Sequence, residues 1–312
     1  MEFVYSPNYN VKLCGLEKIH PFDTCKYEKV AAHLTSIGVK SFVVPSREVS
    51  KEELLEIHTE EYIDSMKKSS AVASWCEMYP LKFVPNYLIQ KLILSPMRYQ
   101  VSGTIIAGEV ALEKGCAVNL GGGMHHASSN DGGGWCLFSD IPLSIKNLMK
   151  KGLIGKAMVI DLDIHQGNGI ERDLKLFKKN SVYMIDAYNH DLYPQDNKAK
   201  KSINIDIKVH ENTTDKEYMK SVKDALDKGL NEFDPDIVFY NAGTDILEGD
   251  PLNGGVVISP QGVIERDMLV MSTFITKKIP IVMVLSGGYS NKSVQVISES
   301  LEKIYKFLFY TF

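Results

Sequence analysis

The most informative stretch of this chain is Asp161-Leu-Asp163-Ile-His165-Gln-Gly-Asn-Gly169. It directly follows Ala157-Met-Val-Ile160, a short apolar run typical of a buried β-strand. Alternate residues of an extended segment point to the same side, so Asp161, Asp163 and His165 can face one site. Two carboxylates and an imidazole suit an oxygen- and nitrogen-ligated divalent metal better than a sulfur-ligated structural zinc. For this stretch alone, a polar loop after a buried strand is the simpler alternative.

Similar apolar runs recur along the chain and alternate with segments of helical periodicity. They occupy residues 116–120, 157–160, 181–185, 236–240 and 279–285. Helices are predicted over 215–229, from Ser259-Pro260 onward, and over 290–309; Thr214 or Asp215 is the expected N-cap of the first, and Gly229 its stop. This alternation predicts an α/β fold whose mostly parallel sheet has helices on both faces. Since no linker or internal repeat interrupts the pattern, residues 1–312 are expected to form a single domain.

Composition narrows the functional classes. The chain has 312 residues, 44% of them hydrophobic, and a formal net charge of -4, without the clustered Lys and Arg of a surface that binds nucleic acid directly. No apolar run reaches the roughly 20 residues of a transmembrane span, and the N-terminus does not resemble a secretory signal. An odd number of cysteines without a CxxC pair fits a reducing compartment; they are Cys14, Cys25, Cys76, Cys116 and Cys136. We therefore expect an intracellular, cytoplasmic protein, with the nucleus as the alternative in a eukaryote; no oligomeric state is predicted.

Three further polar or glycine-rich motifs also follow strand candidates directly. They are Gly121-Gly-Gly-Met-His125-His126, Asn241-Ala-Gly-Thr-Asp245 and Ser286-Gly-Gly-Tyr289. In open parallel α/β sheets, ligands bind beyond the carboxyl ends of the strands. The four motifs are therefore expected to converge on one site at that edge.

The residue types in these motifs predict hydrolytic chemistry. Asp163, His165 and Asp245 form a set of three protein ligands that leaves positions open on a catalytic metal. His125 and His126 can flank a bound water on the glycine-loosened loop, one as general base and the other as general acid or electrostatic partner. Asp161 can hold the second nitrogen of one imidazole, and the Tyr289 hydroxyl can face a developing oxyanion. The residue types alone do not name the metal, and Fe²⁺ suits such an Asp/His/Asp set.

With these motifs, the chain resembles the zinc-dependent histone deacetylase superfamily, which has an arginase-like α/β fold. The resemblance extends over nearly the whole chain and includes His58-Thr-Glu-Glu-Tyr62. His20-Pro-Phe-Asp23, His125-His-Ala-Ser-Ser129 and Gly132-Gly-Gly-Trp135 are most similar to the class IV branch, the histone deacetylase 11-like group. Members of that branch are best known as lysine deacylases that prefer long fatty-acyl groups.

The resemblance implies a role for individual residues. It implies zinc on Asp163, His165 and Asp245, and a catalytic pair formed by His125 and His126. It also implies Asp161 behind His125, Asn168 behind His126, and Tyr289 at the oxyanion. The residues that it implies along the acyl-lysine channel are Trp135, Tyr193, Leu252 and Gly134. A structural potassium ion is implied at Asp161, Asp163, His165, Asp186 and Ala187, mainly through backbone atoms. Because an Asn carries no charge, Asn168 should hold His126 less readily as an imidazolium.

The expected activity is zinc-dependent hydrolysis of Nε-acyl-lysine amides on proteins or peptides, with a preference for long-chain acyl groups over acetyl. Gly132–Gly134 either leave space for the acyl tail or merely permit the turn into Trp135. One alternative is a small-molecule amidohydrolase of the acetylpolyamine type, with Glu248, Asp250 or Glu211 as an acidic gatekeeper. A second alternative is a catalytically silent binder of acyl-lysine.

Overall fold

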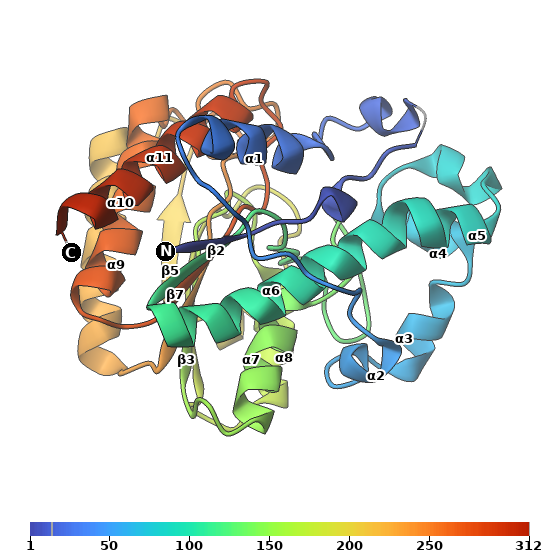
Figure 1. The fold of residues 1–312 in the computed structure, drawn as a ribbon, viewed down its shortest axis with the longest axis horizontal. Coiled ribbons are helices and arrows are strands. Elements are labelled where there is room, and N and C mark those ends of the chain that lie inside the picture. Colours follow the sequence, from blue (N-terminus) through green and yellow to red (C-terminus); the bar gives the residue numbers. More distant parts are fainter. Residues whose placement is uncertain (14, 312) are drawn as a thin grey trace.

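A seven-stranded sheet forms the centre of the computed structural model, which describes residues 1–13 and 15–311 (Figure 1). The strands are β1 (Glu2–Val4), β2 (Cys116–Asn119), β3 (Ala157–Asp161), β4 (Val182–Asn189), β5 (Ile205–Val209), β6 (Ile237–Asn241) and β7 (Ile281–Val284). They lie in the order β1-β2-β7-β6-β3-β4-β5, and every neighbouring pair is parallel. The sheet is therefore parallel throughout, as its buried, near-continuous apolar strands require.

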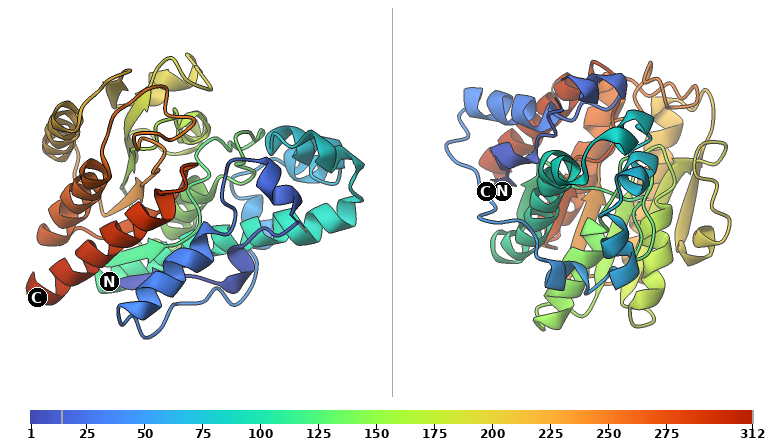
Figure 2. Two further views of the ribbon diagram at one scale, coloured as in Figure 1. Left: turned by 90° about the horizontal axis from the view of Figure 1, so that it is seen from above. Right: turned by 90° about the vertical axis from the view of Figure 1, so that its right-hand side faces the viewer.

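Helices cover both faces of the sheet, as predicted (Figure 2). In β3, Ala157 and Val159 pack with one set of helices, while Met158 and Ile160 pack with the other. The first set is α6 (Ser95–Lys114), α7 (Asp140–Lys150) and α8 (Asn168–Asp173); the second is α1 (Lys26–Ser36), α9 (Asp215–Glu232), α10 (Pro260–Thr276) and α11 (Ser293–Thr311). Alternate strand residues thus supply two separate cores, and both are needed to bury the sheet.

A smaller helical layer lies beside the sheet, at the right of Figure 1. It consists of α2 (Lys51–Leu54), α3 (Glu60–Ser65), α4 (Ser69–Trp75), the 3₁₀ helix Tyr79–Phe83, α5 (Asn86–Ile89) and the π-helical turn Gln90–Leu94. Its core includes Trp135, Cys136 and Phe138 from the loop after β2. This layer therefore builds one wall of the region beyond the carboxyl ends of the strands.

Several element boundaries differ from the predictions. β1 and β5 were not predicted, because β1 has three residues and β5 has an alternating, half-exposed pattern. Gly229 does not end its helix: α9 continues to Glu232, and a Cβ at Gly229 would meet the side chains of Ile185, Met158 and Tyr183. By contrast, Ser259 caps α10 as expected, accepting the Gly262 N–H at 3.0 Å.

Two further sequence expectations concern cysteines and membrane spans. Cys25, Cys76, Cys116 and Cys136 are free thiols in the structure, and Cys14 lies outside the described residues. Among the described residues, no helix has the length and apolar character to cross a bilayer.

Candidate active site

The four motifs converge because β2, β7, β6 and β3 are consecutive neighbours in the sheet. Their last residues form one row across it, in which Asn119 pairs with Val284, Val284 with Asn241, and Asn241 with Asp161. The loops that follow these four strands therefore all begin at the same edge of the sheet. The predicted meeting of the motifs at the carboxyl edge is confirmed.

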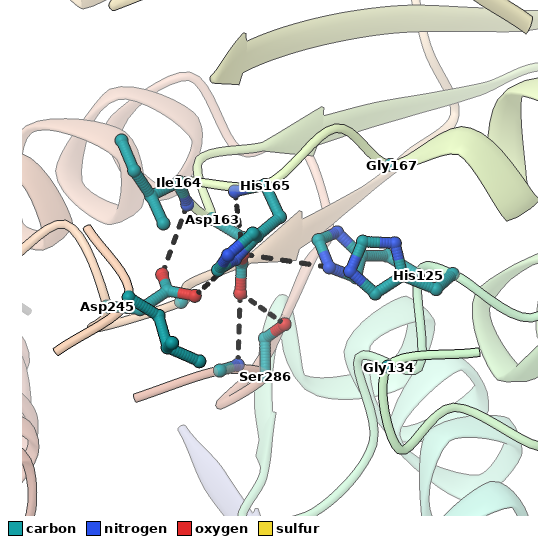
Figure 3. Close-up of polar contacts among 12 residues, drawn as sticks. His125, Gly134, Asp163, Ile164, His165, Gly167, Asp245 and Ser286 are labelled. Atoms are coloured by element: carbon teal, nitrogen blue, oxygen red, sulfur yellow. Dashed lines mark hydrogen bonds and ion pairs between the residues drawn. The ribbon is translucent and has the colours of Figure 1, made fainter. Parts of the chain in front are cut away.

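Asp163, His165 and Asp245 form a compact, buried group at this edge (Figure 3). Their ligand atoms lie within 4.8 Å of one another. His165 Nδ1 is 3.0 Å from Asp245 Oδ2 and 3.2 Å from Asp163 Oδ1, so all three side chains point to one position. Backbone and hydroxyl groups hold the remaining carboxylate oxygens: Ile164 N–H donates to Asp245 Oδ1, while Ser286 Oγ and Gly287 N–H donate to Asp163 Oδ2.

The charges of this group fit a divalent metal. Burial, with the nearby Asp163 carboxylate, raises the pKa of Asp245 to about 7. Burial alone would lower the pKa of His165, but the two carboxylates outweigh it and raise the pKa to about 10. The two buried carboxylates thus require a positive charge between them, and a divalent cation supplies it with a suitable donor set of two oxygens and one nitrogen.

The two adjacent histidines have different partners and different charges. Their ring centroids are 4.1 Å apart; His125 Nδ1 is 2.9 Å from Asp161 Oδ2, and His126 Nδ1 is 2.9 Å from Asn168 Oδ1. Burial opposes a charge on His125, but Asp161 and Asp163 outweigh it and raise its pKa to about 9. Burial and the neighbouring His125 lower the pKa of His126 well below its usual value. In the metal-free site at neutral pH, these opposite shifts favour the proton on His125 and leave His126 as the neutral base.

Asp140, at the start of α7, fixes the loop that carries these histidines. Its two carboxylate oxygens accept the backbone N–H groups of Gly123 and Met124, each at 2.9 Å, and Thr104 Oγ1 donates to it at 2.7 Å. Gly122 and Gly123 both have positive φ, so the loop needs glycine there. Asp140 could not be recognised from the sequence, because an Asp in the first turn of a helix is ordinarily a simple favourable charge at the helix N-terminus.

The turn that carries Tyr289 is held from two sides. Asp250 Oδ2 accepts the N–H groups of Tyr289 and Ser290 at 2.7 and 2.8 Å, while the buried Lys26 ammonium donates to the carbonyls of Ser286 and Gly287. Burial, followed by the Asp245 and Asp163 charges, raises the pKa of Tyr289 well above its usual value, so the hydroxyl keeps its proton. Asp250 is therefore occupied by the turn, which removes it as a free gatekeeper for a distant ammonium.

A small cavity of about 40 Å³ adjoins the histidine pair and the Asp163 side chain. Aromatic and sulfur-containing side chains supply much of its lining, namely Phe22, Tyr27, Met97, Met124, Trp135, Cys136 and Tyr289. Gly134 also lines it. Tyr193 is half exposed, with its ring 5.0 Å from that of His126, so it lies at the outer side of the pair. Leu252 is 37% exposed and does not line the cavity. The structure therefore brings Trp135, Gly134 and Tyr193 to the cavity or the histidines, but not Leu252.

The triple glycine Gly132–Gly134 has a packing reason that neither sequence interpretation included. A Cβ at Gly132 would lie 2.7 Å from Tyr62 Oη, and one at Gly133 would lie 2.5 Å from Tyr193 Oη. At Gly134, where φ is +50°, a Cβ would lie 2.6 Å from His126 Cδ2. The glycines therefore let aromatic and imidazole rings approach the loop closely, and Gly134 also permits the left-handed backbone that leads into Trp135.

Asp186 and Ala187 of β4 lie next to β3, where Asp186 pairs in register with Asp161. Asp186 Oδ2 accepts the Gly167 N–H at 2.9 Å, and the Asp186 carboxyl group also lies beside the buried Glu171 carboxyl group. Burial, together with Asp161 and Glu171, raises the pKa of Asp186 well above its usual value. The expected potassium position therefore lies beside a group of buried carboxyl groups, those of Asp161, Glu171 and Asp186.

A buried Asp/His/Asp group beside a cationic and a neutral histidine, at the carboxyl edge of a parallel α/β sheet, defines the class as a metal-dependent hydrolase. The histone deacetylase domain model matches residues 20–304, and the chain belongs to the histone deacetylase family as a hydrolytic deacetylase.

Individual relatives agree with this assignment. The chain is 44% identical over 306 residues to "Histone deacetylase 2" of Arabidopsis thaliana, covering 97% of this chain and 78% of that protein. It is 26% identical over 268 residues to "Acetoin utilization protein AcuC" of Bacillus subtilis, covering 80% of this chain and 67% of that protein. The solved structure of the HDA15 HD domain has the same fold, with a TM-score of 0.74 at 20% identity over 98% of this chain and 88% of that chain.

Proposed function

We propose that this protein hydrolyses Nε-acyl-lysine amides on proteins or peptides, with zinc held by Asp163, His165 and Asp245. The observation that carries the proposal is the contact between this ligand group and a histidine pair of unequal charge. A divalent metal at this position supplies a Lewis acid for the amide carbonyl and lowers the pKa of water toward about 7. Zinc suits the donor set best, and Fe²⁺ is the alternative.

The side chains divide the remaining work. Neutral His126 takes the proton of the attacking water and later returns it to the departing lysine amine. His125, kept cationic by Asp161, stabilises the negative charge that develops during the attack. The Tyr289 hydroxyl, which stays protonated, donates a hydrogen bond to the former carbonyl oxygen.

We propose that the acyl group enters the cavity beside the histidines and that long chains are favoured over acetyl. A cavity of 40 Å³ accommodates an acetyl group or a few waters. A longer tail requires Met97 and Met124 to move, and methionine adapts its shape readily. Each methylene that becomes buried adds about 0.8 kcal/mol, so activity should depend strongly on chain length.

Other features support assignment to the class IV branch and to one catalytic domain over residues 1–312. His20 and Phe22 of the His-Pro-Phe-Asp motif lie at the proposed site, and each ring contacts both Trp135 and Tyr289 at centroid distances of 5.2 to 6.4 Å. We also propose a structural potassium ion beside Asp186 and the backbone of Asp161, Asp163, His165 and Ala187. Burial and the neighbouring Asp161 and Glu171 carboxylates raise the pKa of Asp186, and this group of buried carboxyls supports a compensating cation there. A cytoplasmic or nuclear location fits such an enzyme.

One experiment tests the activity and the acyl preference together. A single lysine peptide carrying acetyl, octanoyl, myristoyl or palmitoyl groups is assayed alongside acetylspermidine, and the bound metal is measured by elemental analysis. We expect about one equivalent of zinc and kcat/KM rising with chain length. Faster turnover of acetylspermidine than of any peptide would instead support the polyamine alternative.

Tyr289→Phe tests the oxyanion role. We expect kcat to fall by about 100-fold, the usual loss when one oxyanion donor is removed, while zinc stays bound. Turnover equal to that of the wild type would contradict the role.

A further inference from the structure

Arg266 and Asp267 of α10 form a buried ion pair behind the metal-ligand group. Both side chains are at most 1% exposed. Arg266 Nε donates to Asp267 Oδ1 at 3.0 Å, and Nη2 lies 2.8 Å from the same oxygen. Neither side chain takes part in the proposed chemistry. Buried ion pairs of this kind often contribute little net stability over apolar side chains, so the pair calls for another explanation.

The guanidinium of Arg266 joins the two loops that carry the carboxylate ligands. Arg266 Nη1 donates to the Leu162 carbonyl at 3.1 Å and to the Gly243 carbonyl at 2.7 Å. Leu162 immediately precedes Asp163, and Gly243 lies two residues before Asp245. Both carbonyls lie just beyond the ends of β3 and β6, where the sheet no longer pairs all backbone groups. One side chain therefore connects the backbones from which the two carboxylates project.

The two loops touch at the same place. A Cβ at Gly243 would lie 2.3 Å from Asp163 Oδ2 and 2.7 Å from Asp163 Cα. The backbone of one ligand loop thus packs directly against the ligand of the other. Any separation of the Leu162 and Gly243 carbonyls would change the spacing between the carboxylates of Asp163 and Asp245.

Asp267 is fixed by two further elements. Tyr240 Oη of β6 donates to Asp267 Oδ1 at 2.5 Å, and Ser300 Oγ of α11 donates to Asp267 Oδ2 at 2.6 Å. These bonds fix the carboxylate that orients the guanidinium. A planar group with five donors meets two carbonyls and a carboxylate together, whereas a lysine ammonium has no such fork.

We propose that Arg266 is a positioning residue that sets the metal affinity of the Asp163/His165/Asp245 group by tying together the Leu162 and Gly243 carbonyls. The proposal rests on the proposed function, since that group must bind a metal. Arg266 is expected to act before any substrate binds, because it contacts only the backbone behind the ligands. Its loss should therefore weaken metal binding and leave KM unchanged in metal-saturated protein.

The test measures Zn²⁺ affinity in metal-free protein against a competing chelator. Arg266→Met keeps most of the volume without donors, and we expect a 10- to 100-fold weaker affinity, as for other groups that orient metal ligands. Arg266→Lys should give an intermediate loss, and Tyr240→Phe and Ser300→Ala smaller losses. The matched control is Arg98→Met on α6, which removes the partly buried ion pair between Arg98 and Glu48; its Zn²⁺ affinity should equal that of the wild type.

The outcomes separate this role from simple stabilisation. A folded Arg266→Lys protein with a lower unfolding midpoint but wild-type Zn²⁺ affinity would overturn the proposal. If neither Arg266 variant folds, Tyr240→Phe and Ser300→Ala decide, and wild-type affinity in both would also overturn it. A wild-type protein that binds no Zn²⁺ would contradict the proposed metal site itself, which is a distinguishable result.

Discussion

His125 and His126 are neighbours in the chain, yet their Nδ1 atoms face a carboxylate and a neutral amide, respectively. Asp161 faces Nδ1 of the first and Asn168 faces Nδ1 of the second, at the same distance of 2.9 Å. The sequence analysis predicted this difference, because Asn168 has no charge with which to hold an imidazolium. The structure adds the direction for each ring: the pKa of His125 is raised to about 9, and that of His126 is lowered by burial and by the neighbouring charges.

Asn168→Asp should shift the pH dependence of catalysis. A carboxylate in place of the amide raises the pKa of His126, by roughly 1–3 units for a contact of this kind. Since His126 must be neutral to accept a proton, the acidic limb of the kcat/KM profile should move to higher pH. Asn168→Ala is the control, because it removes the acceptor without adding charge and should not move the limb upward. An unmoved limb in Asn168→Asp would show that His126 is not the base.

The site residues that could be predicted from sequence are those whose chemistry is visible in short motifs. Asp163, His165 and Asp245 follow strands, and their side-chain types suit a metal. Lys26, Asp140 and Arg266 could not be found in this way, because each is a charged residue on a helix, and such residues ordinarily face solvent. Only the packing of distant segments buries them against backbone groups of the site, at Ser286, Gly123 and Leu162.

Among the secondary-structure elements, α6 shows how a glycine inside a helix can serve packing rather than helix formation. It is the 20-residue helix that leads from the smaller helical layer onto the sheet (Figure 1). Gly103 on this helix leaves room for Tyr9: a Cβ there would lie 1.8 Å from Tyr9 Oη, which donates to Asn119 Oδ1 at 2.8 Å. Tyr9 also packs against Gly121, at the start of the loop to His125.

Gly103→Ala should therefore destabilise the protein, although alanine favours a helix over glycine by about 1 kcal/mol. Overpacking typically costs about 1–3 kcal/mol, and displacing Tyr9 also breaks its bond to Asn119. We expect a net loss of roughly 2 kcal/mol in the free energy of unfolding, measured in urea. Gly229→Ala in α9 is the control, since its Cβ would meet the terminal methyls of Ile185 and Met158 at 3.0 and 3.5 Å and the Tyr183 ring at 3.6 Å, without any contact below 3.0 Å. Equal effects at both positions would contradict the packing argument.

The fold class was predictable at this scale, but individual boundaries were not. Buried strands are read from continuous apolar runs, so β5 escaped detection because alternate residues of this edge strand face solvent. A glycine at position 229 is typical of a helix stop, whereas here the close approach of α9 to β4 is the reason that a glycine fits at this position. In both cases tertiary packing outweighed the local signal.

At the scale of the whole molecule, the site links the loops that follow the central strands of the sheet. The proposed ligands project from the loops after β3 and β6, and the loop after β7 holds Asp163 through Ser286 and Gly287. Bound metal should therefore stabilise the entire fold, because a ligand that binds only the native state raises its stability. At a free metal concentration 1,000 times the dissociation constant, the gain is about 4 kcal/mol.

Removing the metal with a chelator should accordingly lower the midpoint of thermal unfolding by several degrees, and added Zn²⁺ should restore it. The control is Asp245→Asn, whose midpoint should respond to neither treatment because a ligand is missing. Metal-free Asp245→Asn should also unfold at no lower temperature than metal-free wild type. The neutral amide removes the repulsion from Asp163 that, with burial, raises the pKa of the Asp245 carboxyl to about 7. A wild-type midpoint that is indifferent to the chelator, in protein shown by elemental analysis to have lost its metal, would contradict preferential binding of the metal to the native state.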